Sequence, residues 1–110
     1  MAERGQDGNA QPDWNGALGV SWVAHADAID TLWEPFGKRT IDALAPRPGD
    51  SVLDIGCGAG ATTIEIARRV APRGRSLGVD LSGPLLELAA RRAKTAQVSN
   101  ATFEQADAAT

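Results

Sequence analysis

The sequence has few of the residues on which many common protein functions depend. Its 110 residues include one cysteine, one histidine and no tyrosine. A single cysteine, Cys57, cannot form a disulfide within the chain, so nothing indicates an oxidising compartment. Because no obvious base is near it in the sequence, we interpret Cys57 as a small packed group rather than a nucleophile. A lone histidine near a helix start, such as His25, is typical of a surface or capping group.

Long apolar runs and an excess of positive charge are also missing. No run approaches the roughly 20 apolar residues that span a bilayer, and the polar N-terminus lacks the apolar core of a signal peptide. Eleven basic residues against fourteen acidic ones give a net charge of -3, which argues against nucleic acid as the main partner. The length of 110 residues predicts at most one domain, and 43% hydrophobic residues is ordinary for a globular protein. Together these features predict a cytoplasmic protein that binds neither a membrane nor nucleic acid.

One stretch, residues 51–60, organises the predicted fold. Its first letters, SVLDI, form a short apolar run that predicts a buried strand. The glycines that follow prevent the strand from continuing, and they let the backbone turn sharply and approach a ligand. These glycines are Gly56, Gly58 and Gly60. Residues 61–70 then follow a helical period, so the stretch predicts the opening of a nucleotide-binding βαβ unit.

Aspartates repeat at the ends of three apolar runs. Asp54 lies near the end of the first run, Asp80 ends the second, and Asp107 follows the third. The intervals are 26 and 27 residues (80 minus 54 and 107 minus 80), each about one strand plus one helix. A single aspartate after a strand is ordinary turn chemistry. Three in phase predict a row of carboxylates along one edge of a parallel sheet.

The glycines alone leave two cofactor classes open. Gly56, Gly58 and Ala61 also satisfy the dinucleotide pattern G-x-G-x-x-A, which is typical of NAD(P)-binding oxidoreductases. The charge of Asp54 disfavours this alternative, because a carboxylate at the strand end would repel a pyrophosphate. The same carboxylate suits a ligand that carries an ammonium or a sulfonium.

Three motifs, VLDIGCGAG, VDLS and QADA, together resemble those of class I S-adenosylmethionine-dependent methyltransferases. The resemblance is strongest to the small-molecule branch that includes ubiquinone- and menaquinone-biosynthesis enzymes, and it covers residues 36–110. It implies an α/β fold, a Rossmann-like three-layer sandwich of which the chain holds the first three parallel strands and N-terminal helices. The domain is expected to be incomplete. The implied function is methyl transfer from S-adenosylmethionine to a small-molecule acceptor, and a non-catalytic binding or scaffold protein is the second alternative.

The resemblance also implies roles for individual residues. Asp80 would accept hydrogen bonds from both ribose hydroxyls, and Leu81 would pack on the adenine. Asp107 would bind the adenine amino group with help from the Ala108 backbone, and Asp54 would order the loop and attract the positive end of the cofactor. The implied cofactor-binding set is Asp54, Gly56, Cys57, Gly58, Gly60, Asp80, Leu81, Asp107 and Ala108. No catalytic base and no metal ligand is assigned.

The chain is predicted to have three parts. Residues 1–13 lack any period and predict a disordered tail. Residues 14–50 predict helices, with Pro35 ending or kinking the first of them. Residues 51–110 predict the cofactor-binding half of a domain.

The tryptophans all precede residue 36. Trp33 belongs to a stripe of helical spacing that predicts packing between helices, together with Ile29, Leu32 and Phe36. For Trp14 and Trp22 two interpretations stay open. They pack between helices, or they form a flap over cofactor and substrate, as the resemblance implies.

The helices after residue 60 are predicted to cover one face of the sheet and to leave the other bare. A helix over about 61–71 has Ile64, Ala67 and Val70 inward, and the last N-terminal helix is expected beside it. A second helix begins at the N-cap Ser82 and runs to about residue 96. Its predicted inward residues are Leu85, Leu88, Ala89 and Ala93, and its basic face, Arg91, Arg92 and Lys94, is interpreted as solvated surface.

Overall fold

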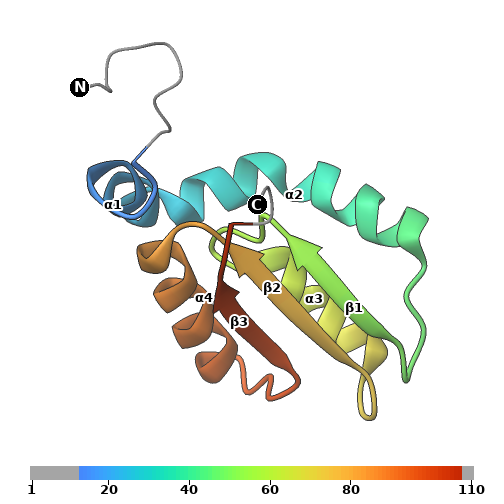
Figure 1. The fold of residues 1–110 in the computed structure, drawn as a ribbon. Helices are drawn as coiled ribbons and strands as arrows, with labels where there is room; N and C mark the ends of the chain where they lie inside the picture. The colour runs from blue at the N-terminus through green and yellow to red at the C-terminus, as the bar shows by residue number, and fades with distance from the viewer. Residues whose placement is uncertain (1–12, 108–110) are drawn as a thin grey trace.

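A computed structural model of the protein describes residues 13–107. Within them, four helices and three strands alternate as an α/β chain (Figure 1). They are α1 (Ala17–Ala24), α2 (Ala26–Leu44), β1 (Ser51–Ile55), α3 (Ala61–Val70), β2 (Arg75–Asp80), α4 (Gly83–Thr95) and β3 (Ala101–Gln105). No helix of this part of the chain has the length and apolarity to cross a membrane. The predicted disordered tail lies outside the described residues except for Asp13, whose carbonyl accepts the N–H of Gly16 before α1.

The three strands form one parallel sheet in the order β1-β2-β3. Leu53 pairs in register with Leu77, and Gly78 pairs with Phe103. Because the strands are parallel, their carboxyl ends lie at the same edge of the sheet. This edge carries Asp80, the last residue of β2, as the spacing of the aspartates predicts.

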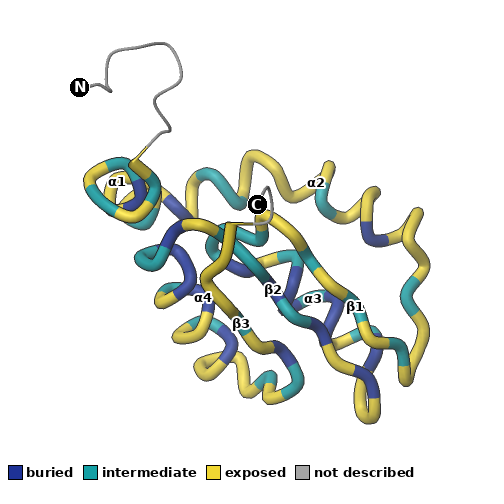
Figure 2. The backbone as a smooth tube through the Cα atoms, viewed as in Figure 1, coloured by how far each residue is buried: buried dark blue, intermediate teal, exposed yellow. Residues whose placement is uncertain are grey.

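Both α3 and α4 pack on the same face of the sheet, with their buried sides turned toward the strands (Figure 2). The predicted inward residues are buried or, for Leu88, half-buried, and Ile66 and Leu86 are buried as well. Each valine, leucine or isoleucine side chain among them contributes roughly 1.5–3 kcal/mol when it is fully buried. From α2, Ile41 joins Ile66 and Val70, so the last N-terminal helix lies beside α3 as predicted.

The opposite face of the sheet is bare in the described part of the chain. Leu53 and Ile55 of β1 point to this face and are 57% and 62% exposed. Their register partners on β2, Leu77 and Val79, are half-buried. The prediction that one sheet face stays uncovered by these helices is therefore confirmed.

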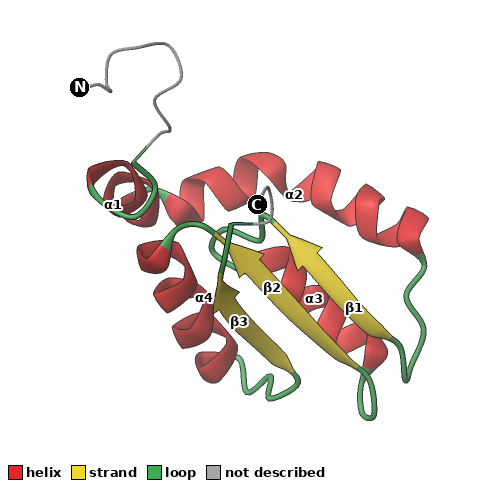
Figure 3. Cartoon of the chain, in the orientation of Figure 1, coloured by secondary structure: helices red, strands yellow, loops and turns green. Residues whose placement is uncertain are grey.

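Of the two predictions for Pro35, the one that it ends a helix is wrong, because α2 runs through Pro35 as one helix (Figure 3). Proline has no N–H to donate to the carbonyl of Thr31. Both residues are exposed, so that water can satisfy this carbonyl. The two ends of α2 are also held separately, by Arg92 at its start and by Ile41 near its end.

The predicted packing of the aromatic stripe on α2 is also wrong. Trp33 is 55% exposed, and Leu32 and Phe36 are exposed too. Trp33 contacts Phe36, with 5.4 Å between ring centroids. A helical period shows which residues share a face, and it does not show whether another element covers that face. In this helix the buried residues are Ala26 and Ile41.

Candidate functional site

The loop after β1 is a left-handed turn that the sequence builds from glycine. Gly56, Gly58 and Gly60 have φ values of 74°, 54° and 88°, which favour glycine because a Cβ is strained there. The N–H groups of Gly56 and Cys57 both donate to the carbonyl of Val79, at 2.7 and 3.1 Å. The loop is thereby fixed to the end of β2.

These glycines serve two different purposes. A Cβ on Gly56 or Gly58 would meet nothing within 4 Å, so the loop backbone is open to a ligand at these residues. A Cβ on Gly60 would lie 2.6 Å from Cβ of Ala89 and 3.0 Å from Cε1 of Phe103. Gly60 is therefore needed for the close packing of α3, α4 and β3, because the position of its missing Cβ faces α4 and β3.

Asp80 ties the glycine loop to the start of α4. Its Oδ2 accepts the N–H of Gly58 at 2.8 Å, and its Oδ1 accepts the N–H of Ser82 at 2.9 Å. Ser82 is the N-cap predicted from the sequence, and its hydroxyl accepts the N–H of Leu85 at 3.2 Å. A carboxylate has about four lone-pair positions, so Asp80 keeps acceptor capacity after these two bonds.

A groove of about 430 Å³ opens at this edge of the sheet. It brings together five residues of the implied cofactor set and both tryptophans of the possible flap. These are Gly56, Gly58, Asp80, Leu81 and Asp107, with Trp14 and Trp22. Sequence reasoning missed Ile55, Val79, Leu85 and Ala106, which also line it. Their only signal was that they lie beside the predicted loop and strand ends.

Three residues of the implied set do not line the groove, and Ala108 lies outside the described residues. Gly60 has the packing role described above. Asp54 faces α3, where the hydroxyl of Thr63 donates to its Oδ2 at 2.6 Å. Burial raises the pKa of Asp54, the Thr63 hydrogen bond opposes this shift, and the charge of Asp80 adds to it. Asp54 thus joins β1 to α3 beneath the loop.

Cys57, the third residue, is half-buried against β2. Burial raises the pKa of its thiol to about 12, and the charges of Asp54 and Asp80 add to this shift. At neutral pH the group is therefore a thiol and not a nucleophilic thiolate. This state agrees with the interpretation of Cys57 as a packed group.

Trp14 and Trp22 form one wall of the groove. Their rings meet edge to face, with centroids 5.2 Å apart. Asn15 docks this wall on the sheet edge, because its side-chain oxygen accepts the N–H of Gly83 and the amide of Gln105, each at 3.1 Å. Sequence reasoning missed Asn15 and Gln105, since an amide pair 90 residues apart leaves no local pattern.

A second groove, of about 520 Å³, lies between α2 and α3 and includes Trp33 and Phe36. It is larger, but it is lined by neither the glycine loop nor the carboxylates at the sheet edge. We therefore place the candidate site at the groove beside the glycine loop.

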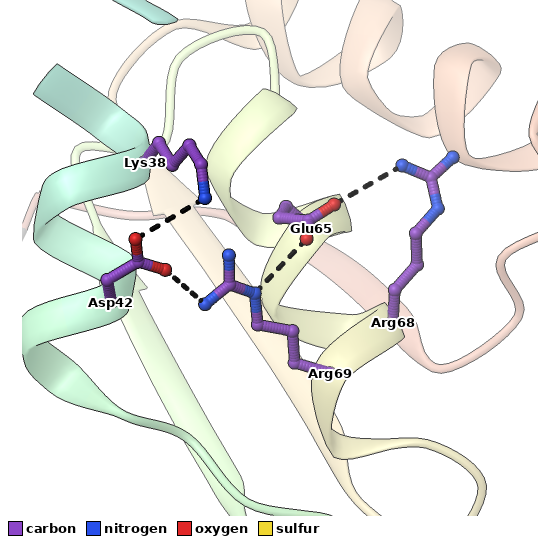
Figure 4. A network of polar contacts seen from close by, with 5 residues as sticks. All are labelled: Lys38, Asp42, Glu65, Arg68 and Arg69. Carbon is purple, nitrogen blue, oxygen red and sulfur yellow. Dashed lines mark hydrogen bonds and ion pairs between the residues drawn. The ribbon is translucent and has the colours of Figure 1, made fainter. Parts of the chain in front are cut away.

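The side chains beside this second groove form a charged network that joins the two helices (Figure 4). From α3, Arg69 donates to Asp42 of α2 at 2.8 Å and to Glu65 at 3.1 Å. Glu65 also pairs with Arg68, three residues further along the same helix, at 3.6 Å. The hydrogen bond that Asp42 accepts from Arg69 lowers the pKa of Asp42. The network fixes α2 on α3 and is a structural feature.

The interpretation of Arg92 as solvated surface is wrong. Its side chain is 21% exposed and pairs with Asp27 and Asp30 of α2. Arg92 lies more than 60 residues away from both acids in the sequence. No local period reveals such a pair.

A family model described as a methyltransferase domain matches residues 46–110. The chain is 39% identical over 62 residues to nocamycin O-methyltransferase of Saccharothrix syringae, covering 56% of this chain and 22% of that protein. It is 42% identical over 60 residues to demethylmenaquinone methyltransferase of Symbiobacterium thermophilum, covering 54% and 24%. The chain thus spans under a quarter of the length of these curated relatives.

A solved structure resembles the fold as well as the sequence. It is that of a SAM-dependent methyltransferase from Thiobacillus denitrificans in complex with S-adenosyl-L-homocysteine. The TM-score is 0.56 at 34% identity, and the match covers 66% of this chain and 29% of that one. The matched part of this chain therefore shares its fold with part of that protein.

Proposed function

Because the chain belongs to the methyltransferase domain family, we propose that it binds S-adenosylmethionine in the groove beside the glycine loop and serves methyl transfer to a small-molecule acceptor. In this proposal residues 51–110 form the cofactor-binding part, and residues 14–50 form a helical segment that covers it. The names of the two curated relatives, which concern nocamycin and demethylmenaquinone, support a small molecule as acceptor. A cytoplasmic location is part of the proposal and rests on the single, half-buried cysteine.

The observation that carries the proposal is the placement of Asp80. Its carboxylate lines the groove beside the open backbone of Gly56 and Gly58, and it keeps lone pairs for further donors. Two neighbouring hydroxyls, such as those of a ribose, suit such an acceptor. Leu81 and Asp107 line the same groove and would take the adenine face and its amino group.

When bound, S-adenosylmethionine supplies an activated methyl group, because its sulfonium is the leaving group. The chain then has to align the two reactants and keep water away. We assign alignment to the glycine loop and Asp80, and the exclusion of water to Trp14 and Trp22. His25 does not line the groove, and its Nδ1 lies 2.9 Å from the carbonyl of Ser21, so we give it no role as a base.

Geometry also weighs against the dinucleotide alternative. In dinucleotide-binding folds the backbone N–H groups of the glycine turn face the pyrophosphate. Here the N–H of Gly58 already donates to Asp80, and a pyrophosphate at this turn would meet that carboxylate. The carboxylate that would meet the pyrophosphate is therefore Asp80 and not Asp54, which faces Thr63.

Thermal melts of the full-length protein with either ligand test the proposal. A ligand at 100 times its Kd stabilises the folded state by about 2.7 kcal/mol. We expect S-adenosylhomocysteine to raise the melting temperature by roughly 5 °C or more, and NAD to leave it unchanged. Stabilisation by NAD alone would overturn the proposal.

The scaffold alternative needs a second measurement. A protein that binds S-adenosylhomocysteine and transfers no methyl group to quinone or phenol acceptors would favour a non-catalytic role. We expect transfer of labelled methyl to at least one acceptor of these classes.

A further inference from the structure

Arg92 joins three parts of the chain that are far apart in the sequence. From α4, its guanidinium donates to the carboxylates of Asp27 and Asp30 near the start of α2, and Nη2 lies 2.5 Å from Oδ1 of Asp27. Nη1 also donates to the carbonyl of Ala59 in the glycine loop, at 3.4 Å. A planar guanidinium has several donors in a fixed fork, so it can hold these acceptors together.

The contact with Ala59 lies next to the candidate site. Ala59 directly follows Gly58, whose N–H donates to Asp80. Arg92 and Asp80 therefore hold adjacent residues of the same loop, one from outside the groove and one from within it. A shift of Arg92 would act on the loop backbone at the position where Asp80 is fixed.

The contact with α2 fixes the aromatic wall of the groove. His25 is the one residue between α1 and α2, and it bonds to both: its N–H donates to the carbonyl of Trp22 at 3.2 Å, and its carbonyl accepts the N–H of Ile29 at 3.0 Å. Because of this direct junction, fixing the first turns of α2 also fixes α1, which carries Trp22. Asn15 docks the other end of this wall.

We propose that Arg92 is a positioning residue that holds the aromatic wall of Trp14 and Trp22 against the glycine loop. The inference deepens the proposed function and rests on it, because a wall held in this way would cover bound S-adenosylmethionine and add to its affinity. Arg92 itself does not line the groove, so it acts through the loop and through α2. A lysine cannot replace it fully, since one ammonium cannot reproduce the two-nitrogen fork.

The test compares Arg92→Gln with Arg91→Gln in the full-length protein. Arg91 is an exposed arginine on the same helix, so that its variant removes the same charge. Both variants are made in a parent protein that carries Trp33→Phe. This change is needed because Trp33 is exposed and would mask the emission of the other two tryptophans. Acrylamide quenching of this emission reports on the wall, and calorimetric titration with S-adenosylhomocysteine reports on the site.

In Arg92→Gln we expect a larger quenching constant and a dissociation constant raised about 3- to 10-fold. Arg92→Lys should lie between this variant and the parent. Arg91→Gln should match the parent in both measurements. Adding Asp30→Asn to Arg92→Gln should cause little further loss, because the two changes remove one interaction. If Arg92 served folding stability alone, Arg92→Gln would melt at a lower temperature. At temperatures well below that melting point, its quenching constant and its dissociation constant would then match those of the parent.

The outcomes separate the inference from the proposed function. If the parent binds S-adenosylhomocysteine and Arg92→Gln matches Arg91→Gln in both measurements, the positioning role is wrong and the proposed function stands. If the parent does not bind, the proposed function fails, and the quenching constants still decide whether Arg92 holds the wall. Should Arg92→Gln not fold, Asp27→Asn removes only a fully exposed partner and should show the same shifts at smaller size.

Discussion

The two walls of the groove are held in place in different ways. The glycine-loop wall is bonded to β2 by backbone N–H groups and rests on the buried face of α3. The aromatic wall is docked by side chains, through Asn15 and Arg92, over separations of more than 60 residues. The loop wall is thus part of the folded core. The aromatic wall belongs to the segment around α1, which packs on the start of α4 with the buried Gly19 close to Ser82, and these polar contacts add to that packing.

The largest expected effect concerns the reactivity of Cys57 in the loop wall. With a thiol pKa of about 12, the thiolate fraction at pH 8 is about a thousandth of that of a free cysteine. We expect iodoacetamide to alkylate Cys57 on the order of 100- to 1,000-fold more slowly than a free cysteine at pH 8, because the greater nucleophilicity of a high-pKa thiolate offsets part of the loss in thiolate fraction. The rate should rise tenfold per pH unit up to pH 11, because burial and the nearby carboxylates favour the protonated form.

Alkylation in denaturant is the control, since unfolding removes both causes of the shift. A native rate that levels off between pH 8 and 9 would show that Cys57 is accessible and ionised, and that the loop is less closely packed in solution than in the structure.

Gly60→Ala should cost the most stability in the loop wall. The new Cβ would overlap Ala89, and the left-handed φ of 88° adds strain. Together these effects should lower the free energy of unfolding by roughly 2–4 kcal/mol. Gly56→Ala is a matched control, because its φ of 74° imposes similar strain and its Cβ meets nothing within 4 Å. Urea unfolding of both variants measures the difference, and equal losses would contradict the packing role of Gly60.

A smaller effect is expected at the aromatic wall from Asn15→Ala. The change leaves the N–H of Gly83 without its side-chain acceptor, which should cost about 1 kcal/mol. Asn15→Asp keeps an oxygen acceptor and should lose less. Because Asn15 bonds to the start of α4 and the end of β3, hydrogen exchange should increase in α1 and stay unchanged in β1 and α3. Faster exchange across all of these elements would mean that the two walls unfold together.

The difference between the walls also explains what the sequence can predict. The loop wall follows from local rules: alternating glycines end a strand, a helical period follows, and aspartates recur at the spacing of strand plus helix. These features place Asp80 at the sheet edge without any knowledge of contacts. The packing role of Gly60 is not visible in this way, since it depends on Ala89 and Phe103, which are distant in the sequence.

For the aromatic wall, the sequence leaves two alternatives open: Trp14 and Trp22 pack between helices, or they form a flap. The contacts of Asn15 and of Arg92 join polar residues that have no period and no motif. The charge of Arg92 looks like that of any exposed helix residue until α2 is placed beside it. The same reason explains the misjudged stripe around Trp33, because its exposure depends on which element lies opposite.

The central claim is that the loop wall binds the cofactor through Asp80 and that the aromatic wall only covers it. Calorimetric titration of the full-length protein with S-adenosylhomocysteine tests this claim, with Asp80→Asn and the double variant Trp14→Phe, Trp22→Phe side by side. Losing the carboxylate should cost about 2–4 kcal/mol, or roughly 30- to 1,000-fold in affinity, and the double variant should lose less than about tenfold. If Asp80→Asn stays folded and binds within threefold of the wild type, the assignment of Asp80 and of the cofactor site is wrong.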